Sequence, residues 1–234
     1  LKYLEKLENC QKLELIDLSG NEIQELPDKF FENCRGLFEI YLRDNKISSI
    51  QASALKGLIR LSELYLANNK IKFIEADTLT YHSSLACLDL SNNELSSLPH
   101  DFYASPSRLL KLLLDKNNFN ELPEVIDNLS NLVELTLADN KIRTLSGTLK
   151  NSNLRTLSLK NNEIEFISPM FFKTLTSLNT IDLCNNRCVR SVCNFGNNNI
   201  LPFLKNCYDE FLKATFCNFH HDTKNGYTCR LILD

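Results

Sequence analysis

The chain has 234 residues and a formal net charge of −3. A general nucleic-acid-binding protein is expected to be basic, so this balance argues against nucleic acid as a partner. No apolar run approaches the roughly 20 residues that a membrane-spanning helix needs, so no membrane span is predicted. The sequence begins without methionine or a signal-peptide pattern, and we interpret it as a mature form or a trimmed piece.

A single pattern, L-x-x-L-x-L-x-x-N-x-L, recurs along the chain and is clearest from Leu85 to Leu95. Its alternation predicts a short strand with one buried face, and its asparagine can bond to its own turn and to an adjacent repeat. One copy cannot bury its leucines alone, so stacked copies must share a core. The copies open at Leu13, Leu37, Leu61, Leu85, Leu109, Leu132, Leu154 and Leu178, in steps of 24, 24, 24, 24, 23, 22 and 24 residues.

This pattern resembles the leucine-rich repeat. The resemblance implies an α/β solenoid, a horseshoe with a parallel β-sheet on its concave side. The Leu-Pro pairs at 26–27, 98–99 and 122–123 resemble the "typical" subfamily of animal extracellular proteins. That likeness implies few regular helices on the convex side, which should consist of loops and short turns.

Three segments follow from the spacing. Residues 1–12 are predicted to be a partial N-terminal repeat or cap, because counting back one period from Leu13 places Leu1 in mid-repeat. Either residues precede Leu1, which we favour, or the helix-like series of Leu1, Leu4 and Leu7 covers the open end. Residues 13–187 are predicted to form eight repeats, and residues 188–234 a cysteine-rich C-terminal cap.

A further core position lies three residues before each opening leucine. Cys10 and Cys34 occupy it in adjacent repeats, and we interpret them as buried free thiols that act as small apolar side chains. The alternative is a disulfide, because equivalent positions of adjacent turns lie about 5 Å apart. His82 occupies the same position and is interpreted as a core or edge histidine with its hydrogen bonds satisfied.

Six of the nine cysteines fall in the last 51 residues. This density predicts a disulfide-linked cap and an oxidising compartment, hence an extracellular location as a secreted protein or an ectodomain. Four of five candidates are expected to form two bridges of undetermined connectivity; the candidates are Cys188, Cys193, Cys207, Cys217 and Cys229. The sequon at Asn128 makes that residue a candidate for N-glycosylation.

The cap is also predicted to contain a helix. Apolar residues recur at helical spacing from Ile200 to Phe216, and we expect this segment to cover the core of the last repeat. Nine is an odd number, so at least one thiol is free unless another chain takes part. Cys87 and Cys184, at strand positions predicted to be exposed, are the best candidates for unpaired thiols.

No catalytic motif is present: the chain lacks G-x-S-x-G, H-E-x-x-H and a Walker loop. We therefore predict neither enzymatic activity nor a cofactor. The metal-like cluster from Cys217 to Asp222 is interpreted as part of the disulfide cap. Asp17, Asp89 and Asp182 recur in one strand column and are predicted to form a solvated face.

The outward positions of the strands remain as a binding surface for a protein ligand. Tyr41 and Tyr65 are predicted to stack one strand apart, rimmed by charged residues. Aromatic and aliphatic groups within a charged rim are typical of protein-binding hot spots, although scattered exposed apolar residues are also normal. The partner-binding candidates are Tyr41, Tyr65, Glu39, Glu63, Arg43 and Leu113.

The cap gives a more specific resemblance. It lacks the Asn-Pro-x-x-Cys-x-Cys pattern of vertebrate Toll-like receptors, and its spaced cysteines with Gly226-Tyr227-x-Cys229 resemble those of insect leucine-rich immune proteins. The chain resembles Toll-type receptor ectodomains less closely. The insect family implies covalent dimers with a coiled coil that hold a complement-like thioester protein in circulation. Residues 230–234 could begin such a helix, but no heptads or dimerising cysteine are visible, so homo- or heterodimerisation stays open.

Three functions compete, all of them non-catalytic. A secreted innate-immunity binding protein is favoured. The alternatives are the ectodomain of a membrane receptor or adhesion protein, which Toll-type receptors exemplify, and an extracellular matrix component. Small leucine-rich proteoglycans of the matrix usually carry an N-terminal cysteine cluster, and this sequence shows none.

Overall fold

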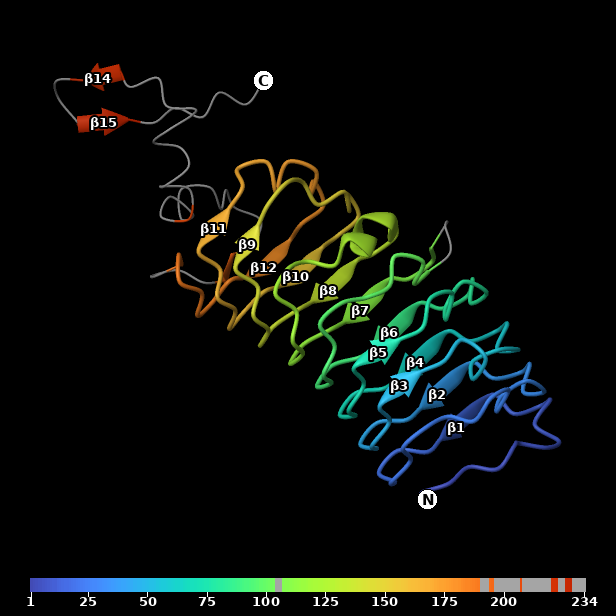
Figure 1. Ribbon diagram of the computed structural model, residues 1–234. Coiled ribbons are helices and arrows are strands. Elements are labelled where there is room, and N and C mark those ends of the chain that lie inside the picture. The colour runs from blue at the N-terminus through green and yellow to red at the C-terminus, as the bar shows by residue number, and fades with distance from the viewer. Residues whose placement is uncertain (104–106, 190–193, 196–206, 208–219, 223–225, 229–234) are drawn as a thin grey trace.

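A computed structural model describes residues 1–103, 107–189, 194–195, 207, 220–222 and 226–228. Its main sheet holds eight short parallel strands, one from each repeat, which follow one another along the solenoid in Figure 1. These strands are β1 (Leu15–Asp17), β2 (Glu39–Tyr41), β4 (Glu63–Tyr65), β6 (Cys87–Asp89), β7 (Lys111–Leu113), β8 (Glu134–Thr136), β10 (Thr156–Ser158) and β12 (Thr180–Asp182). The predicted solenoid with a parallel sheet is thereby confirmed.

Equivalent positions of the repeats lie side by side in this sheet. Ile40 of β2, for example, is aligned with Leu64 of β4, and both are buried. The central residue of each strand thus points into the core, while its two neighbours point to the opposite, concave face. Outward side chains of successive repeats therefore form columns along the sheet.

The opposite side of the solenoid has little regular structure in the described residues. Two short parallel sheets pair β3 (Ser49–Ile50) with β5 (Phe73–Ile74) and β9 (Thr144–Leu145) with β11 (Phe166–Ile167). One 3-10 helix, η1 (Glu124–Asn128), follows Pro123. This arrangement confirms the prediction of few regular helices.

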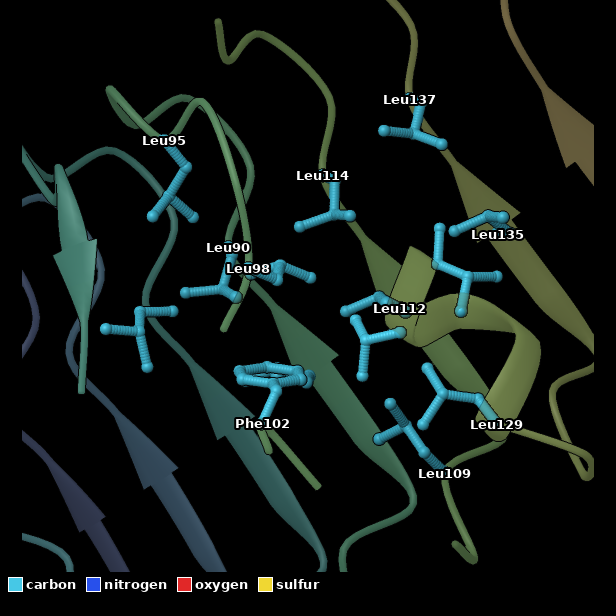
Figure 2. Close-up of a cluster of buried hydrophobic side chains, with 14 of the residues drawn as sticks. Leu90, Leu95, Leu98, Phe102, Leu109, Leu112, Leu114, Leu129, Leu135 and Leu137 are labelled. Carbon is cyan, nitrogen blue, oxygen red and sulfur yellow. The ribbon is translucent and has the colours of Figure 1, made fainter. Parts of the chain in front are cut away.

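A continuous apolar core runs the length of the repeats. Figure 2 shows its centre, where Leu90, Leu112 and Leu135 come from successive repeats and Phe102 enters from the connecting segment. All four side chains are almost fully buried. Because each leucine packs against its equivalents in neighbouring repeats, no single repeat could bury this surface by itself.

The signature asparagines satisfy the polar groups beside this core. The Asn93 amide Nδ2 donates to the carbonyls of Leu66 at 3.0 Å, Leu90 at 3.0 Å and Ser91 at 3.2 Å. Its Oδ1 accepts a hydrogen bond from the backbone N–H of Ile71 at 2.9 Å. Asn93 thus bonds to its own turn and to the preceding repeat, which confirms the predicted role of this residue.

A second, exposed ladder of polar residues runs beside the buried asparagines. Asn92 donates to Asn68 at 2.7 Å, and Asn68 donates to Asp44 at 2.8 Å. Each of these residues has a positive φ, a conformation that Asn and Asp tolerate better than most residues. Lys116, at the next repeat, also has a positive φ of 53° but is neither Asn nor Asp. The ladder resumes where Asn161 bonds to Asp139 at 2.7 Å.

The interpretation of Cys10 and Cys34 as free thiols was wrong, because the two residues form a disulfide with a Cα–Cα distance of 4.8 Å. Equivalent positions of adjacent turns lie one strand spacing apart, which falls within the range that a disulfide spans. Cys188 and Cys207, two of the predicted cap cysteines, form a second disulfide. The candidates Cys193, Cys217 and Cys229 lie outside the described residues.

The two ends differ from the repeats. Leu4 and Leu7 pack partly buried against the core, but Leu1 is 66% exposed and residues 1–12 contain no helix. In the cap, β13 (Asn194–Phe195) pairs antiparallel with β12, and β14 (His220–Asp222) pairs antiparallel with β15 (Gly226–Thr228). The predicted helix from residue 200 to 216 lies outside the described residues, apart from residue 207.

Candidate protein-binding site on the concave face

The two tyrosines lie together on the concave face. Tyr41 ends β2 and Tyr65 ends β4, and the parallel register aligns them directly. Their rings stack with centroids 4.8 Å apart and an interplanar angle of 10°. The repeat period therefore converts a separation of 24 residues in the sequence into an aromatic contact on the surface.

Each tyrosine is held by a carboxylate of its own strand. The Tyr41 hydroxyl donates to Glu39 Oε2 at 2.6 Å, and the Tyr65 hydroxyl donates to Glu63. The hydrogen bond that Tyr41 donates to Glu39 raises the pKa of Tyr41. Burial, followed by the hydrogen bond donated to Glu63, raises the pKa of Tyr65. Both hydroxyls are consequently neutral at physiological pH, and both rings are fixed in position.

Arg43 extends across the tyrosine pair. Its guanidinium carbon lies 4.2 Å from the ring centroid of Tyr65 and 5.9 Å from that of Tyr41, within range of cation–π attraction. Its Nη2 lies 3.3 Å from Asp89 Oδ2 of β6. One side chain thus connects three repeats and holds the tyrosine stack against the sheet.

Asp89 contradicts the prediction that its column forms a solvated face. The residue is only 5% exposed. Its Oδ1 accepts hydrogen bonds from the Ser91 backbone N–H at 3.1 Å and from the Ser91 hydroxyl at 2.6 Å. Arg43, which reaches Asp89 across Tyr65, provides the cation that a buried carboxylate needs. Asp17, at the equivalent position of β1, is exposed as predicted.

The same columns continue beyond the tyrosine pair. Leu113 of β7 is aligned with Asp89 and is half-buried. Cys87 of β6 is a half-buried free thiol, and burial is the main cause that raises the pKa of this thiol. Lys111 of β7 pairs with Glu134 of β8 at 3.0 Å. The predicted site residues therefore share one face, although Leu113 lies two strands from Tyr65.

Sequence reasoning missed the contact between Arg43 and Asp89 and the burial of Asp115. Burial raises the pKa of Asp115, whose carboxylate accepts hydrogen bonds from the Thr136 hydroxyl at 2.7 Å and the Ala138 N–H at 2.6 Å. The register of the repeats was the available signal, since it places these side chains on adjacent columns. It does not show how far a long side chain such as Arg43 extends.

His82 is buried in the core, behind the main sheet and away from the concave face. Its Nε2 lies 3.1 Å from the carbonyl oxygen of Leu55, but its Nδ1 has no hydrogen-bond partner among the residues that the structure describes. The prediction that its hydrogen bonds are satisfied therefore holds for Nε2 only. Burial lowers the pKa of this imidazole, so the ring is neutral near physiological pH.

In the part of the chain that the structure describes, no cluster of His, Cys, Asp and Glu could hold a metal ion. The same part contains no helix with the length and apolar character that a membrane span requires.

Solved structures with the same fold include receptors of the Toll type. A TLR13 chain in complex with ssRNA13 is 27% identical, with a TM-score of 0.70 over 74% of this chain and 25% of its own. Toll from Drosophila, in complex with Spatzle, is 24% identical, with a TM-score of 0.64 over 76% of this chain and 28% of its own. A leucine-rich-repeat protein of Leptospira interrogans is 25% identical, with a TM-score of 0.57 over 74% of this chain and 49% of its own.

This chain spans about a quarter to a half of the length of these structures. No curated protein matches its sequence significantly. The neighbours support the predicted resemblance to Toll-type ectodomains, which the sequence interpretation had ranked below the insect immune proteins. The leucine-rich-repeat profile matches residues 11–71, 59–119 and 152–192, together more than half of the chain. The chain therefore belongs to the leucine-rich-repeat family.

Proposed function

We propose that this chain is a non-catalytic recognition module that binds a protein through its concave face at Tyr41 and Tyr65. The observation that carries this proposal is the order of the tyrosine stack, which Glu39, Glu63 and Arg43 hold in place. Side chains fixed before binding lose little conformational entropy when a partner docks. Partly exposed tyrosines of this kind offer a large contact area at low entropic cost.

An extracellular location is part of the proposal. The Cys10–Cys34 and Cys188–Cys207 disulfides support an oxidising compartment. Among the structural neighbours, Toll was solved with Spatzle, and their complex is a molecular hub in Drosophila development and innate immunity. We favour a secreted innate-immunity binding protein, with a receptor ectodomain and a matrix component as the alternatives.

Nucleic acid is the partner class that requires a direct test. TLR13 was solved with single-stranded RNA, so the fold itself does not exclude such a ligand. The local charges nevertheless favour a protein partner, because Glu39 and Glu63 flank the tyrosines and the one arginine there is bound to Asp89. A phosphate backbone would meet carboxylates at this site rather than free cations.

Asn128 is proposed as a glycosylation site. It is exposed at the end of η1, which lies outside the main sheet. A glycan there would leave the concave strands accessible. Mass measurement of the protein from a secreting eukaryotic cell, with Asn128→Gln as control, should show one glycan that the variant lacks.

Affinity capture tests the proposed surface. The immobilised wild-type chain is exposed to conditioned extracellular medium, and the retained proteins are quantified by mass spectrometry. The Tyr41→Ala/Tyr65→Ala variant should retain these partners at a level reduced by about tenfold or more, as expected for the loss of hot-spot residues. A labelled single-stranded RNA is tested in parallel and should not bind.

A matched variant controls for effects on the sheet. Thr156→Ala/Ser158→Ala removes two outward side chains from β10, in the columns of Glu39 and Tyr41. This variant should retain the same proteins as the wild type, and both variants should keep the far-UV circular dichroism of the wild type. Equal retention by the tyrosine variant would show that partners bind elsewhere, and tight RNA binding would contradict the choice of partner class.

A further inference from the structure

The concave face around Tyr41 is acidic, and its carboxylates at Asp17, Glu39 and Glu63 form no ion pairs with the residues that the structure describes. We define the acidic aromatic patch as Leu15, Asp17, Glu39, Tyr41 and Glu63, which lie on the adjacent strands β1, β2 and β4. Building on the proposed function, we propose that the partner segment that docks on this patch is basic, with an arginine or lysine flanked by apolar side chains.

Two carboxylates of the patch lie side by side without a cation between them. Glu39 and Glu63 are aligned in the parallel register, and like charges on adjacent strands repel one another. Each accepts a tyrosine hydroxyl, but neither forms an ion pair with any residue that the structure describes. Glu134, in the same column of β8, instead pairs with Lys111. A cation from a partner would relieve the repulsion between Glu39 and Glu63.

Arg43 of this chain shows how a tyrosine ring and an aspartate can together hold an arginine on this surface. Arg43 lies over the Tyr65 ring and pairs with Asp89, which is aligned with Tyr65 on the next strand. On the other side of the stack, Asp17 is aligned with Tyr41 in the same way. Asp17 is exposed and accepts a hydrogen bond from the Ser19 backbone N–H at 2.9 Å. Tyr41 and Asp17 thus provide an aromatic ring and a carboxylate for a second cationic group.

An apolar contact completes the patch. Leu15 is 48% exposed and is aligned with Glu39 on the neighbouring strand. A partner segment that places a cation between the carboxylates can therefore bury an adjacent apolar side chain on Leu15 and the Tyr41 ring. Charge complementarity would speed the association and select against acidic partners and nucleic acid. Contact between apolar groups would provide the affinity.

Two synthetic peptides of equal length test this inference. One alternates arginine with phenylalanine, and the other alternates glutamate with phenylalanine. Titrations followed by NMR should show that the arginine peptide binds the wild-type chain about tenfold or more tightly than the glutamate peptide, with an affinity that falls as salt rises. Equal affinities, or no binding of either peptide at millimolar concentration, would overturn the inference.

Two double glutamine variants test whether the charges of the patch itself are needed to bind the arginine peptide. Glu39→Gln/Glu63→Gln removes two charges while the glutamine oxygens can still accept the tyrosine hydroxyls. It should lower the affinity for the arginine peptide by about tenfold. Glu163→Gln/Glu165→Gln also removes two charges, but next to β11 rather than on the main sheet, and both of these carboxylates already pair with Arg187. It should change the affinity less than about twofold, and an equal loss in both variants would mean that net charge alone drives binding.

The same variants separate this inference from the proposed function. If the tyrosine variant loses the captured proteins but Glu39→Gln/Glu63→Gln retains them fully, the partner is not basic and the concave site still stands. If neither variant changes the captured proteins, the concave site itself is wrong. Loss of capture in both variants, together with retention by Glu163→Gln/Glu165→Gln, is the expected result.

Discussion

The two halves of the concave face differ although their backbones are the same. From β2 to β6, a network of Tyr41, Tyr65, Arg43 and Asp89 crosses three strands. On β8, β10 and β12 the equivalent column carries Thr136, Ser158 and Asp182, whose side chains are shorter than tyrosine. The buried leucines and asparagines keep the same register in both halves.

This difference shows how a repeat protein separates stability from recognition. Inward positions set the fold, and substitution there would disturb the shared core. Outward positions are free to vary, so one half can carry an ordered aromatic and charged network while the other carries small polar groups. If recognition resides in the first half, perturbing that half should have effects that matched changes in the second half lack.

The largest expected effect on stability comes from the disulfide of the first half. Cys10→Ser/Cys34→Ser should lower the free energy of unfolding by about 3 kcal/mol, as expected for a loop of this size. Hydrogen exchange should speed up in β1 and β2 but not in β10 and β12, because repeats unfold partly independently. Cys87→Ser, which removes a free thiol, is the control, and an equal loss there would contradict this expectation.

The next effect should come from the buried carboxylate of the network. Asp89→Ala should cost about 2 kcal/mol, because it removes the ion-pair partner of Arg43 and two hydrogen bonds to Ser91. This cost is lower than that of breaking a fully buried ion pair, because the Arg43 side chain is 39% exposed and water can solvate it. Ser158→Ala in the second half should stay within about 0.5 kcal/mol. Chemical denaturation measures both, and similar losses would mean that Asp89 contributes no more than an ordinary surface residue.

A smaller effect, this time a gain in stability, is expected at Lys116 on the boundary between the halves. Lys116 has a positive φ of 53° and interrupts the exposed polar ladder. Lys116→Asn should stabilise the protein by about 0.5–1 kcal/mol, because asparagine tolerates this conformation and can donate to Asn92. Lys160→Asn, at a position without positive φ, should give no gain in thermal unfolding. A loss of stability at position 116 would show that the lysine makes a contact worth more than the backbone strain.

The smallest expected effect is on how the free energy of unfolding depends on pH, and it comes from His82 in the core of the first half. Burial lowers the pKa of His82 below its ordinary 6.5, so the unfolded chain takes up a proton before the folded one. This contribution to stability is fully present above about pH 6.5 and is lost as the pH falls toward the lowered pKa. His82→Leu should flatten this part of the pH profile, whereas Asn151→Leu, at the same repeat position of the second half, should not. An unchanged slope in His82→Leu would assign the pH dependence to other groups.

Much of this architecture could be predicted from the sequence because the repeat period determines the register. The positions of Asn93 in its ladder and of Tyr41 beside Tyr65 follow directly from that period. The burial of Asp89 could not be predicted, because it depends on an arginine that reaches across two strands. The Cys10–Cys34 disulfide was within geometric reach, but thiols at this distance are also common as buried apolar residues.

The cap was harder to predict than the repeats because no period applies there. Cysteine density identified a disulfide-linked segment, and the Cys188–Cys207 bridge confirms it in part. Density does not specify pairing, and it gave no indication of strands β13, β14 and β15. The chemistry of the concave face could be inferred from residue types, whereas the order of the tyrosine stack required its hydrogen bonds and the position of Arg43.

Photo-crosslinking tests most directly whether partners bind the first half of the concave face. A benzophenone amino acid replaces Tyr41 in one variant and Ser158 in the other, at equivalent positions of β2 and β10. Both variants are irradiated in the same extracellular medium, and cross-linked proteins are identified by mass spectrometry. We expect strong cross-links to a defined set of proteins from position 41 and few from position 158. Cross-links from position 158 alone, or equal ones from both, would contradict a binding site at the tyrosine stack.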